Sequence, residues 1–173
     1  MSQAPSSGTT RDSAAIDPAH DNAGVVFPPP FVYALPFLAG VALHRWVGHD
    51  AFADAVHAAT RPVGIGIVAL GMLSSFSGII TFRLAHTAII PHKPASRVVR
   101  HGPYRFTRNP MYLGLALVYL GLPLFFGYAW PYVLFPIAAL SIDRNVIPKE
   151  EAYMARHFGD DYLRYKASVR RWI

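Results

Sequence analysis

Three long stretches of the chain carry no charged side chain, and their apolar residues predict helices that cross a membrane. The uncharged stretch 22–44 overlaps an apolar run that predicts a first crossing at 31–47. In the second stretch, Arg61 and Arg83 bracket 21 uncharged residues, which predicts a crossing at 62–82. Each run is close to the length of helix that spans the hydrocarbon core of a bilayer. The small residues of the second run also predict close packing against a neighbouring helix.

The third uncharged stretch, 110–142, has 33 residues and is too long for a single crossing. As one helix it would measure roughly 50 Å, whereas the hydrocarbon core is about 30 Å thick. Turn-forming residues at 127–131 predict a hairpin of two short crossings, at 111–126 and 131–147. The expected fold class is therefore all-α: a polytopic membrane protein with about four transmembrane helices, a C-terminal helical hairpin and amphipathic interfacial helices at 148–173.

Basic residues are concentrated in two segments, which predicts the orientation of these crossings. The loop 83–110 holds six Lys and Arg residues and no acidic residue, and the tail after Ile142 holds seven Lys and Arg against five Asp and Glu. Because Lys and Arg accumulate on the cytoplasmic side, we expect both segments there. With four crossings the N-terminus is cytoplasmic as well. The expected location is the bacterial cytoplasmic (inner) membrane.

The composition indicates a protein that is solvated by lipid, and it excludes several kinds of site. Of the 173 residues, 53% are hydrophobic and 15% are charged, with a formal net charge of +6, whereas soluble domains carry about 25% charged residues. The absence of Cys excludes a disulfide framework and a thiolate zinc site, and the histidines lack metal-ligand spacing, so we expect no metal. We expect a disordered cytoplasmic leader at 1–30 and a single membrane domain at 31–173.

The loop 83–110 ends in a sequence that favours binding of an anion. Asn109 precedes Pro110, which suits the first position of a helix, so Asn109 is expected at the N-cap of the third crossing. The unpaired N–H groups and the positive end of the helix dipole would then lie beside Arg105 and Arg108. This arrangement attracts a carboxylate or a phosphate.

Aromatic residues are interleaved with these arginines, at Tyr104, Phe106 and Tyr112. A ligand with an aromatic ring, a carboxylate and a cationic centre would find a partner for each group in this segment. The alternative explanation of the basic residues is contact with anionic lipid headgroups, which contributes about 1 kcal/mol per basic residue near the surface. Charge alone would favour that alternative, but it gives the aromatic residues no role.

Two adjacent acidic residues, Glu150 and Glu151, follow the fourth crossing in a helix expected to begin at Pro148. The helix dipole favours acids in a first turn without any function. Adjacent residues lie about 100° apart around a helix, so the two carboxylates should point to different partners. Because the hairpin leaves and returns on one side, both acids are expected beside Arg108 and Asn109. The predicted site is a cleft with one basic and one acidic wall.

These motifs together resemble a known family. The pattern HGPYRFTRNPMYLG at 101–114, the hydrophobic hairpin, EE at 150–151 and the later FGDDYLRY and VRRW are similar to the isoprenylcysteine carboxyl methyltransferase family and its phospholipid N-methyltransferase relatives. The compound pattern runs from about residue 82 to 172. The order and spacing of its parts make it more specific than any one motif alone.

The resemblance implies a small integral membrane enzyme that uses S-adenosylmethionine, with a cytoplasmic cofactor pocket and a lateral opening for a lipophilic substrate. The cofactor-binding residues that it implies are His101, Gly102, Pro103, Tyr104, Arg108, Asn109, Pro110, Tyr112, Glu150 and Glu151. The expected catalytic residues are Arg108, Glu151 and Arg170. Asn109 stands where the eukaryotic carboxyl methyltransferases have His.

The sequence leaves the methyl acceptor open. A carboxylate acceptor needs no general base and can be held by an arginine such as Arg170 or Arg105, whereas an amine must lose a proton, for example to Glu151 or His101. Prenylated cysteine, an aminophospholipid, and another lipophilic acid, thiol or amine are all compatible. A non-enzymatic module that binds anionic lipid would instead tolerate Arg-to-Lys changes. The expected partners are a lipophilic or lipid substrate and membrane lipids, with no nucleic acid.

Overall fold

The computed structural model describes residues 24–25, 27–48, 54–86 and 96–173, and this part of the chain is helical with no extended strand. The predicted leader at 1–30 therefore lies largely outside the described residues. The elements are α1 (Pro29–Val47), α2 (Asp54–Leu84), the 3-10 helix η2 (Gly102–Arg105), α3 (Pro110–Phe126), α4 (Trp130–Ser141), the π-helix η3 (Ile142–Val146), α5 (Ile147–Phe158) and α6 (Asp160–Ser168). The all-α class is confirmed.

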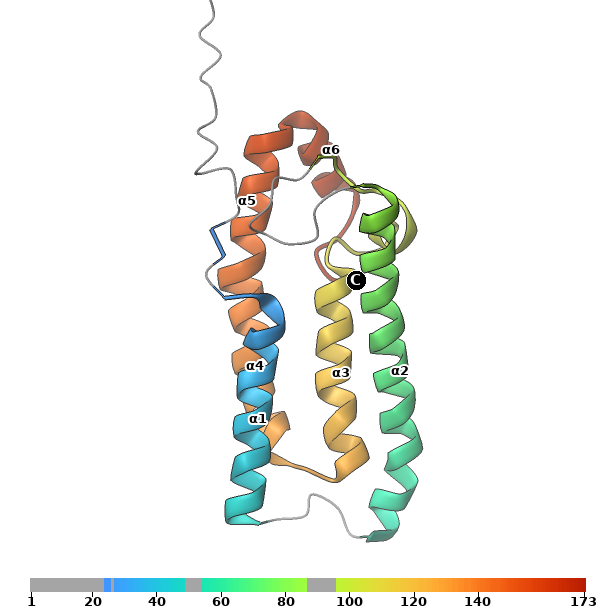
Figure 1. The fold of residues 1–173 in the computed structure, drawn as a ribbon, viewed down its shortest axis with the longest axis vertical. Coiled ribbons are helices and arrows are strands. Elements are labelled where there is room, and N and C mark those ends of the chain that lie inside the picture. The colour runs from blue at the N-terminus through green and yellow to red at the C-terminus, as the bar shows by residue number, and fades with distance from the viewer. Residues whose placement is uncertain (1–23, 26, 49–53, 87–95) are drawn as a thin grey trace, which may run out of the picture.

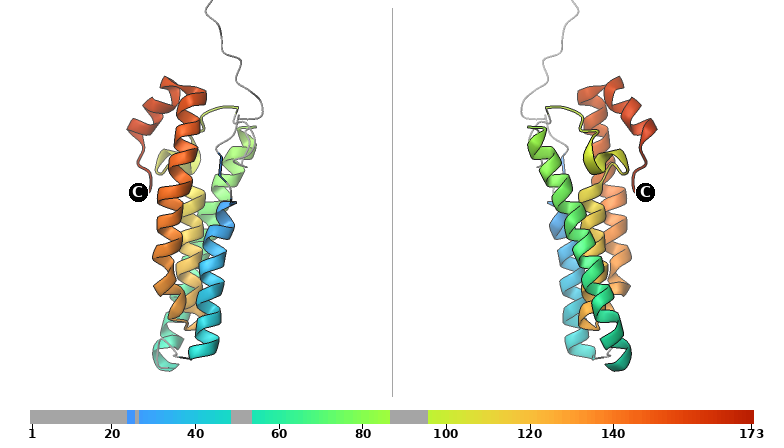
Figure 2. Two further views of the ribbon diagram at one scale, coloured as in Figure 1. Left: turned by 90° about the vertical axis from the view of Figure 1, so that its left-hand side faces the viewer. Right: turned by 90° about the vertical axis from the view of Figure 1, so that its right-hand side faces the viewer.

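The first four α-helices form an elongated bundle in which α1 lies beside α4 and α2 lies beside α3 (Figure 1). Helices α5 and α6 project from one end of this bundle, together with η2, as the rotated views in Figure 2 also show. The C-terminus returns to the same end, close to the start of α3. Segments far apart in the sequence thus meet at one end of the molecule.

Small residues allow α2 and α3 to pack with their backbones in close approach. A Cβ atom added to Gly71 would lie 2.6 Å from the carbonyl oxygen of Gly114, and one added to Gly64 would lie 2.8 Å from that of Gly121. The hydroxyl of Ser74 donates a hydrogen bond to the Pro110 carbonyl at 2.8 Å. These contacts place the start of α3 firmly against α2.

The predicted hairpin turn is confirmed, but the helix that follows it is longer than expected. Gly127 adopts the left-handed conformation (φ 78°) that ends α3, and α4 begins three residues later. We expected a new helix at Pro148. Instead, α4, η3 and α5 continue without a break, because the π-helix η3, in which the Ile147 N–H donates to the Ile142 carbonyl, shifts the hydrogen-bond pattern just before Pro148. We call this continuous element the α4–α5 rod.

Helix α2 also differs from its predicted bounds. It begins at Asp54 rather than near 62, and Pro62 lies inside it. The Arg61 guanidinium lies over the Phe125 ring, 4.9 Å from its centroid, so a cation–π contact accommodates this charge within the helix. Arg61, which we expected to mark the start of the crossing, instead lies inside α2 and contacts α3.

Among the described residues, one helical segment, His57–Leu84, is long and apolar enough to cross a membrane by length and composition. Helix α3 is apolar but shorter than this segment. Many large apolar side chains of α2 are exposed, for example Leu70 (57%) and Leu73 (66%). The number of crossings, expected to be about four, stays a prediction.

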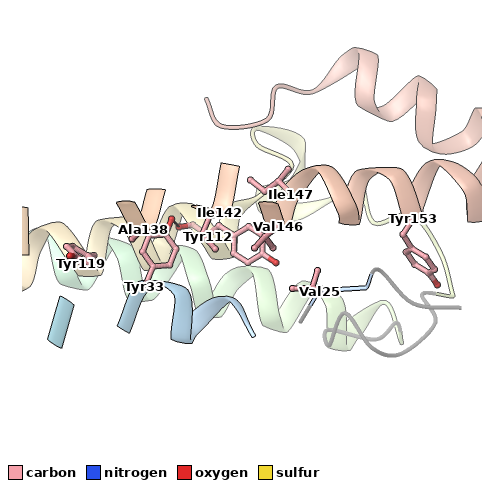
Figure 3. Close-up of a cluster of buried hydrophobic side chains, with 9 residues drawn as sticks. All are labelled: Val25, Tyr33, Tyr112, Tyr119, Ala138, Ile142, Val146, Ile147 and Tyr153. Carbon is pink, nitrogen blue, oxygen red and sulfur yellow. Dashed lines mark hydrogen bonds between the residues drawn. The ribbon is translucent and has the colours of Figure 1, made fainter. Parts of the chain in front are cut away.

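A core of tyrosine and aliphatic side chains joins α1, α3 and the α4–α5 rod (Figure 3). Ile142 and Ile147 are completely buried on the rod, and Tyr119 contacts Phe37 with ring centroids 5.2 Å apart. Tyr112 belongs to this core at the first turn of α3. The core therefore fixes the rod against the start of α3, where the predicted site lies.

Candidate functional site

The segment before α3, residues 107–109, is held by the C-terminal segment, residues 169–173. Asn109 occupies the predicted N-cap position, but its side chain makes no capping hydrogen bond. Its Nδ2 donates instead to the Arg171 carbonyl at 2.9 Å, and the backbone N–H of Arg108 donates to the Arg170 carbonyl at 3.0 Å. The hydroxyl of Thr107 also donates to the Arg171 carbonyl, at 3.0 Å. Asn109 is thus the N-cap residue, as expected, while its side chain binds the C-terminal segment instead of capping the helix.

Glu151 is the centre of a buried ion-pair cluster. Its side chain is 7% exposed and pairs with Arg108 Nη2 at 3.1 Å, Lys166 Nζ at 2.9 Å and Arg171 Nη2 at 3.1 Å. Burial by itself would raise the pKa of Glu151, but hydrogen bonds from Lys166 and Arg171 and the Arg108 charge hold it below its usual value. Glu151 is therefore ionised and fully occupied by cations.

Glu150 has a different environment, as the helical spacing predicts. Its Oε1 accepts a hydrogen bond from the Tyr112 hydroxyl at 2.6 Å, and no cation pairs with it among the described residues. Burial raises the pKa of Glu150 to about 7; the Tyr112 hydrogen bond opposes this shift and the Glu151 charge adds to it. Glu151 is thus neutralised by cations, whereas Glu150 can still accept a cationic partner.

Two buried polar atoms beside these acids have no hydrogen-bond partner within the described residues. They are the hydroxyl of Tyr104, whose side chain is 4% exposed, and Nε of Arg108. Burial raises the pKa of Tyr104, and the charges of Tyr165 and Glu150 raise it further. Buried polar groups normally have partners, so two unsatisfied donors at one site favour a place for a ligand.

Tyr104 is positioned by the small helix η2. It packs against Phe82, with ring centroids 5.0 Å apart, and its carbonyl accepts a hydrogen bond from the Tyr165 hydroxyl at 2.9 Å. Gly102, which has φ +61°, begins this helix, and a Cβ atom there would lie 2.8 Å from Thr81 Oγ1. The conformation and the space both require glycine at this position.

Several predicted site residues lie outside the ion-pair cluster. The side chains of His101 and Arg105 are exposed, and in the described part of the chain neither contacts the two glutamates. Pro103 contributes its carbonyl to the turn, where it accepts from Phe106 and Thr107. These residues shape the segment that carries Tyr104 rather than meeting the acids directly.

Sequence reasoning selected Arg170 in the C-terminal segment, whereas the structure brings Arg171 to Glu151. The Arg170 side chain is exposed and reaches the Ile173 carbonyl at 3.4 Å. The segment leaves α6 in an extended conformation at Val169, and successive side chains of an extended chain point in opposite directions. The VRRW pattern indicated an arginine here, but only the direction of the backbone decides which one.

Asp143 and Trp172, which the sequence did not single out, complete the cluster. Arg171 Nη1 lies 3.3 Å from Asp143 Oδ1, and the indole N–H of Trp172 donates to the same oxygen at 3.0 Å. Arg171 thus links η3, α5 and the C-terminal segment. These partners are 20 or more residues apart, beyond the reach of local periodicity.

The fold and this cluster together define a helical protein with a membrane-type apolar surface and a charged site at one end of its bundle. The chain belongs to the phospholipid methyltransferase family, whose model matches residues 59–161. The matched range contains the basic loop, the hairpin and both glutamates. It confirms the resemblance found in the sequence.

Two of the relatives that match this chain are named methyltransferases. An uncharacterized protein of Haemophilus influenzae is 41% identical over 63 residues, covering 36% of this chain and 100% of the relative. A protein-S-isoprenylcysteine O-methyltransferase of Schizosaccharomyces pombe is 27% identical over 107 residues, covering 61% of this chain and 45% of the relative. Protein-S-isoprenylcysteine O-methyltransferase A of Arabidopsis thaliana is 28% identical over 132 residues, covering 75% and 60%.

The chain thus spans 45% and 60% of the lengths of these two named methyltransferases. No solved structure matches it.

Proposed function

We propose that this chain is an S-adenosylmethionine-dependent membrane methyltransferase that modifies a lipophilic acceptor at the cytoplasmic membrane face. The reaction it most resembles is isoprenylcysteine carboxyl O-methylation. One observation carries the proposal: the start of α3 and the segment before it meet the acidic pair, with Tyr112 bound to Glu150 at 2.6 Å and Arg108 to Glu151 at 3.1 Å. In this proposal residues 31–173 act as one membrane domain, and both termini are cytoplasmic.

The groups at this site fit the cofactor. S-adenosylmethionine carries a carboxylate, an ammonium, a sulfonium and an adenine ring. Glu150 has no cation among the described residues and suits the ammonium, while the unsatisfied Nε of Arg108 suits the carboxylate. The rings of Tyr104 and Tyr112 suit the sulfonium or the adenine. Glu151, already surrounded by cations, holds Arg108 in place.

When bound, S-adenosylmethionine supplies a methyl group on a sulfonium, which is transferred by in-line displacement. This chemistry requires alignment and exclusion of water rather than a covalent nucleophile. Tyr112 fixes the orientation of the Glu150 carboxylate through its hydrogen bond. The C-terminal segment holds Arg108 and Asn109 through backbone carbonyls and covers this side of the site. The protein's contribution is a preorganised, largely buried set of charged and aromatic side chains.

Calorimetric titration of S-adenosylmethionine into detergent-solubilised protein tests this assignment. Glu150→Gln keeps an acceptor for Tyr112 but removes the charge, so we expect binding to weaken about tenfold or more. Asp160→Asn removes an exposed acid of α6 and is the matched control, with unchanged affinity expected. Wild-type affinity in both Glu150→Gln and Arg108→Ala would reject the site. Absence of binding to the wild-type protein would favour the lipid-binding module.

A second candidate, N-methylation of an aminophospholipid, is supported by the pKa of Glu150. A carboxylate with a pKa of about 7 can accept a proton from an ammonium acceptor more readily than an ordinary glutamate. The two reactions give different products from a radiolabelled methyl donor. A methyl ester releases methanol in alkali, whereas an N-methyl group is stable there. Incubation with a prenylated cysteine and with phosphatidylethanolamine, followed by alkali, therefore distinguishes them.

A further inference from the structure

A groove separate from the ion-pair cluster lies between α1 and the α4–α5 rod. It has a volume of about 370 Å³ and is lined on the rod by Ser141, Asn145 and Lys149. Lys149 and Glu151 are two residues apart in α5, which places them about 200° apart around the helix. The groove and the ion-pair cluster therefore occupy roughly opposite faces of the rod.

The two walls of the groove differ in polarity. The α1 wall is apolar and includes Phe31 and Leu35, which are 57% and 61% exposed. The polar residues of the rod wall are spaced four residues apart, from Ser141 through Asn145 to Lys149. Along the rod wall polarity thus increases toward α5, whereas the rest of the lining, which includes Val25 and Phe27 before α1 and Val146 on the rod, is apolar. An elongated amphiphile has the same gradient from its hydrocarbon chain to its headgroup.

Lys149 supplies the charge that selects the ligand. Its side chain is exposed, and no acidic side chain pairs with it in the described ranges. It lies just beyond the predicted crossing 131–147, at the level where lipid headgroups are expected. A lysine at this level attracts the phosphate of an anionic lipid.

We infer that this groove binds one anionic phospholipid of the surrounding leaflet, with an acyl chain along the α1 wall and the headgroup phosphate at Lys149. The volume is within the range of pockets that hold small molecules, about 300–1,000 Å³. Neither the ligand nor its position requires methyl transfer. The inference depends only on the chain lying in a membrane, so its outcome is independent of the proposed activity.

Photocrosslinking of the full chain in nanodiscs tests this site. Phosphatidylglycerol and phosphatidylcholine, each with a diazirine in the acyl chain, are compared, and labelled peptides are identified by mass spectrometry. We expect peptides of α1 and of 141–149 to be labelled about fivefold more by the anionic lipid, the preference expected from one lysine near the surface. Equal labelling of these peptides by the two lipids would overturn the inference.

Matched variants distinguish lipid binding in the groove from lipid contact elsewhere on the protein. Lys149→Glu should abolish the preference for the anionic lipid, whereas Arg156→Glu, a change of the same charge on an exposed residue of α5, should retain it. Leu35→Trp should reduce labelling of the groove by both lipids. Leu70→Trp, at a residue of similar exposure on α2, should not. A preference that survives Lys149→Glu would refute the lipid site.

Discussion

Removing the charge of Glu151 is the most direct test of the ion-pair cluster. Glu151→Gln leaves a side chain of nearly the same size but places three cations around a neutral amide. The three cations are not equivalent, because Arg108 is 10% exposed whereas Lys166 and Arg171 are 41% and 32% exposed. The largest loss therefore comes from Arg108, whose charge becomes buried without its partner.

The expected change in the free energy of unfolding follows from how exposed the three cations are. Breaking a buried pair from one side costs about 3–5 kcal/mol, whereas pairs near solvent contribute about 0–1 kcal/mol each because water screens them. Since Arg108 keeps some access to solvent, we take the low end and expect Glu151→Gln to reduce the free energy of unfolding by about 3 kcal/mol. The Asn109 and Thr107 bonds to the C-terminal segment should weaken with it, because Arg171 keeps only Asp143 of its two anionic partners.

The assay is unfolding of the detergent-solubilised protein, followed by Trp fluorescence, since Trp172 contacts this cluster through Asp143. Asp161→Asn is the control, because Asp161 is 51% exposed and pairs with the exposed Arg100 and Arg164. We expect the control to change stability by less than about 1 kcal/mol. Equal effects of the two variants would show that the cluster around Glu151 does not hold this end of the molecule together.

Three further predictions address pH, helix packing and the C-terminal segment. Because the pKa of Glu150 is raised from 4.5 to about 7, the folded state binds this proton more tightly than the unfolded state. Stability should thus fall as pH rises from about 4.5 to 7, and Glu150→Gln should flatten that part of the profile in pH-dependent unfolding. Gly71→Leu should separate α2 from α3 and lower the melting temperature sharply, whereas Gly66→Leu, where a Cβ meets nothing within 4 Å, should not. Arg171→Ala should increase proteolysis of the C-terminal segment and weaken S-adenosylmethionine binding, whereas Arg170→Ala should change neither, because its side chain is exposed; equal effects would contradict the observed orientation.

The elements of this protein could be predicted from the sequence because their causes are local. Runs without charge predict helices, since the hydrogen bonds of a helix are satisfied within the segment itself. Gly127 predicts the turn, because glycine adopts its positive φ without strain. The different partners of Glu150 and Glu151 follow from the angle between adjacent helical residues. The meeting of these acids with Arg108 follows from the hairpin that joins them.

Tertiary structure decided the features that depend on partners distant in sequence. The rod continues through Pro148 because the π-helix η3 shifts the hydrogen-bond pattern just before the proline, and packing of Ile142 and Ile147 holds the two halves in line. Arg171 rather than Arg170 reaches Glu151 because the extended backbone after α6 turns alternate side chains outward. Periodicity indicates which residues share a face, but the orientation of that face is set by long-range packing, which no local pattern records.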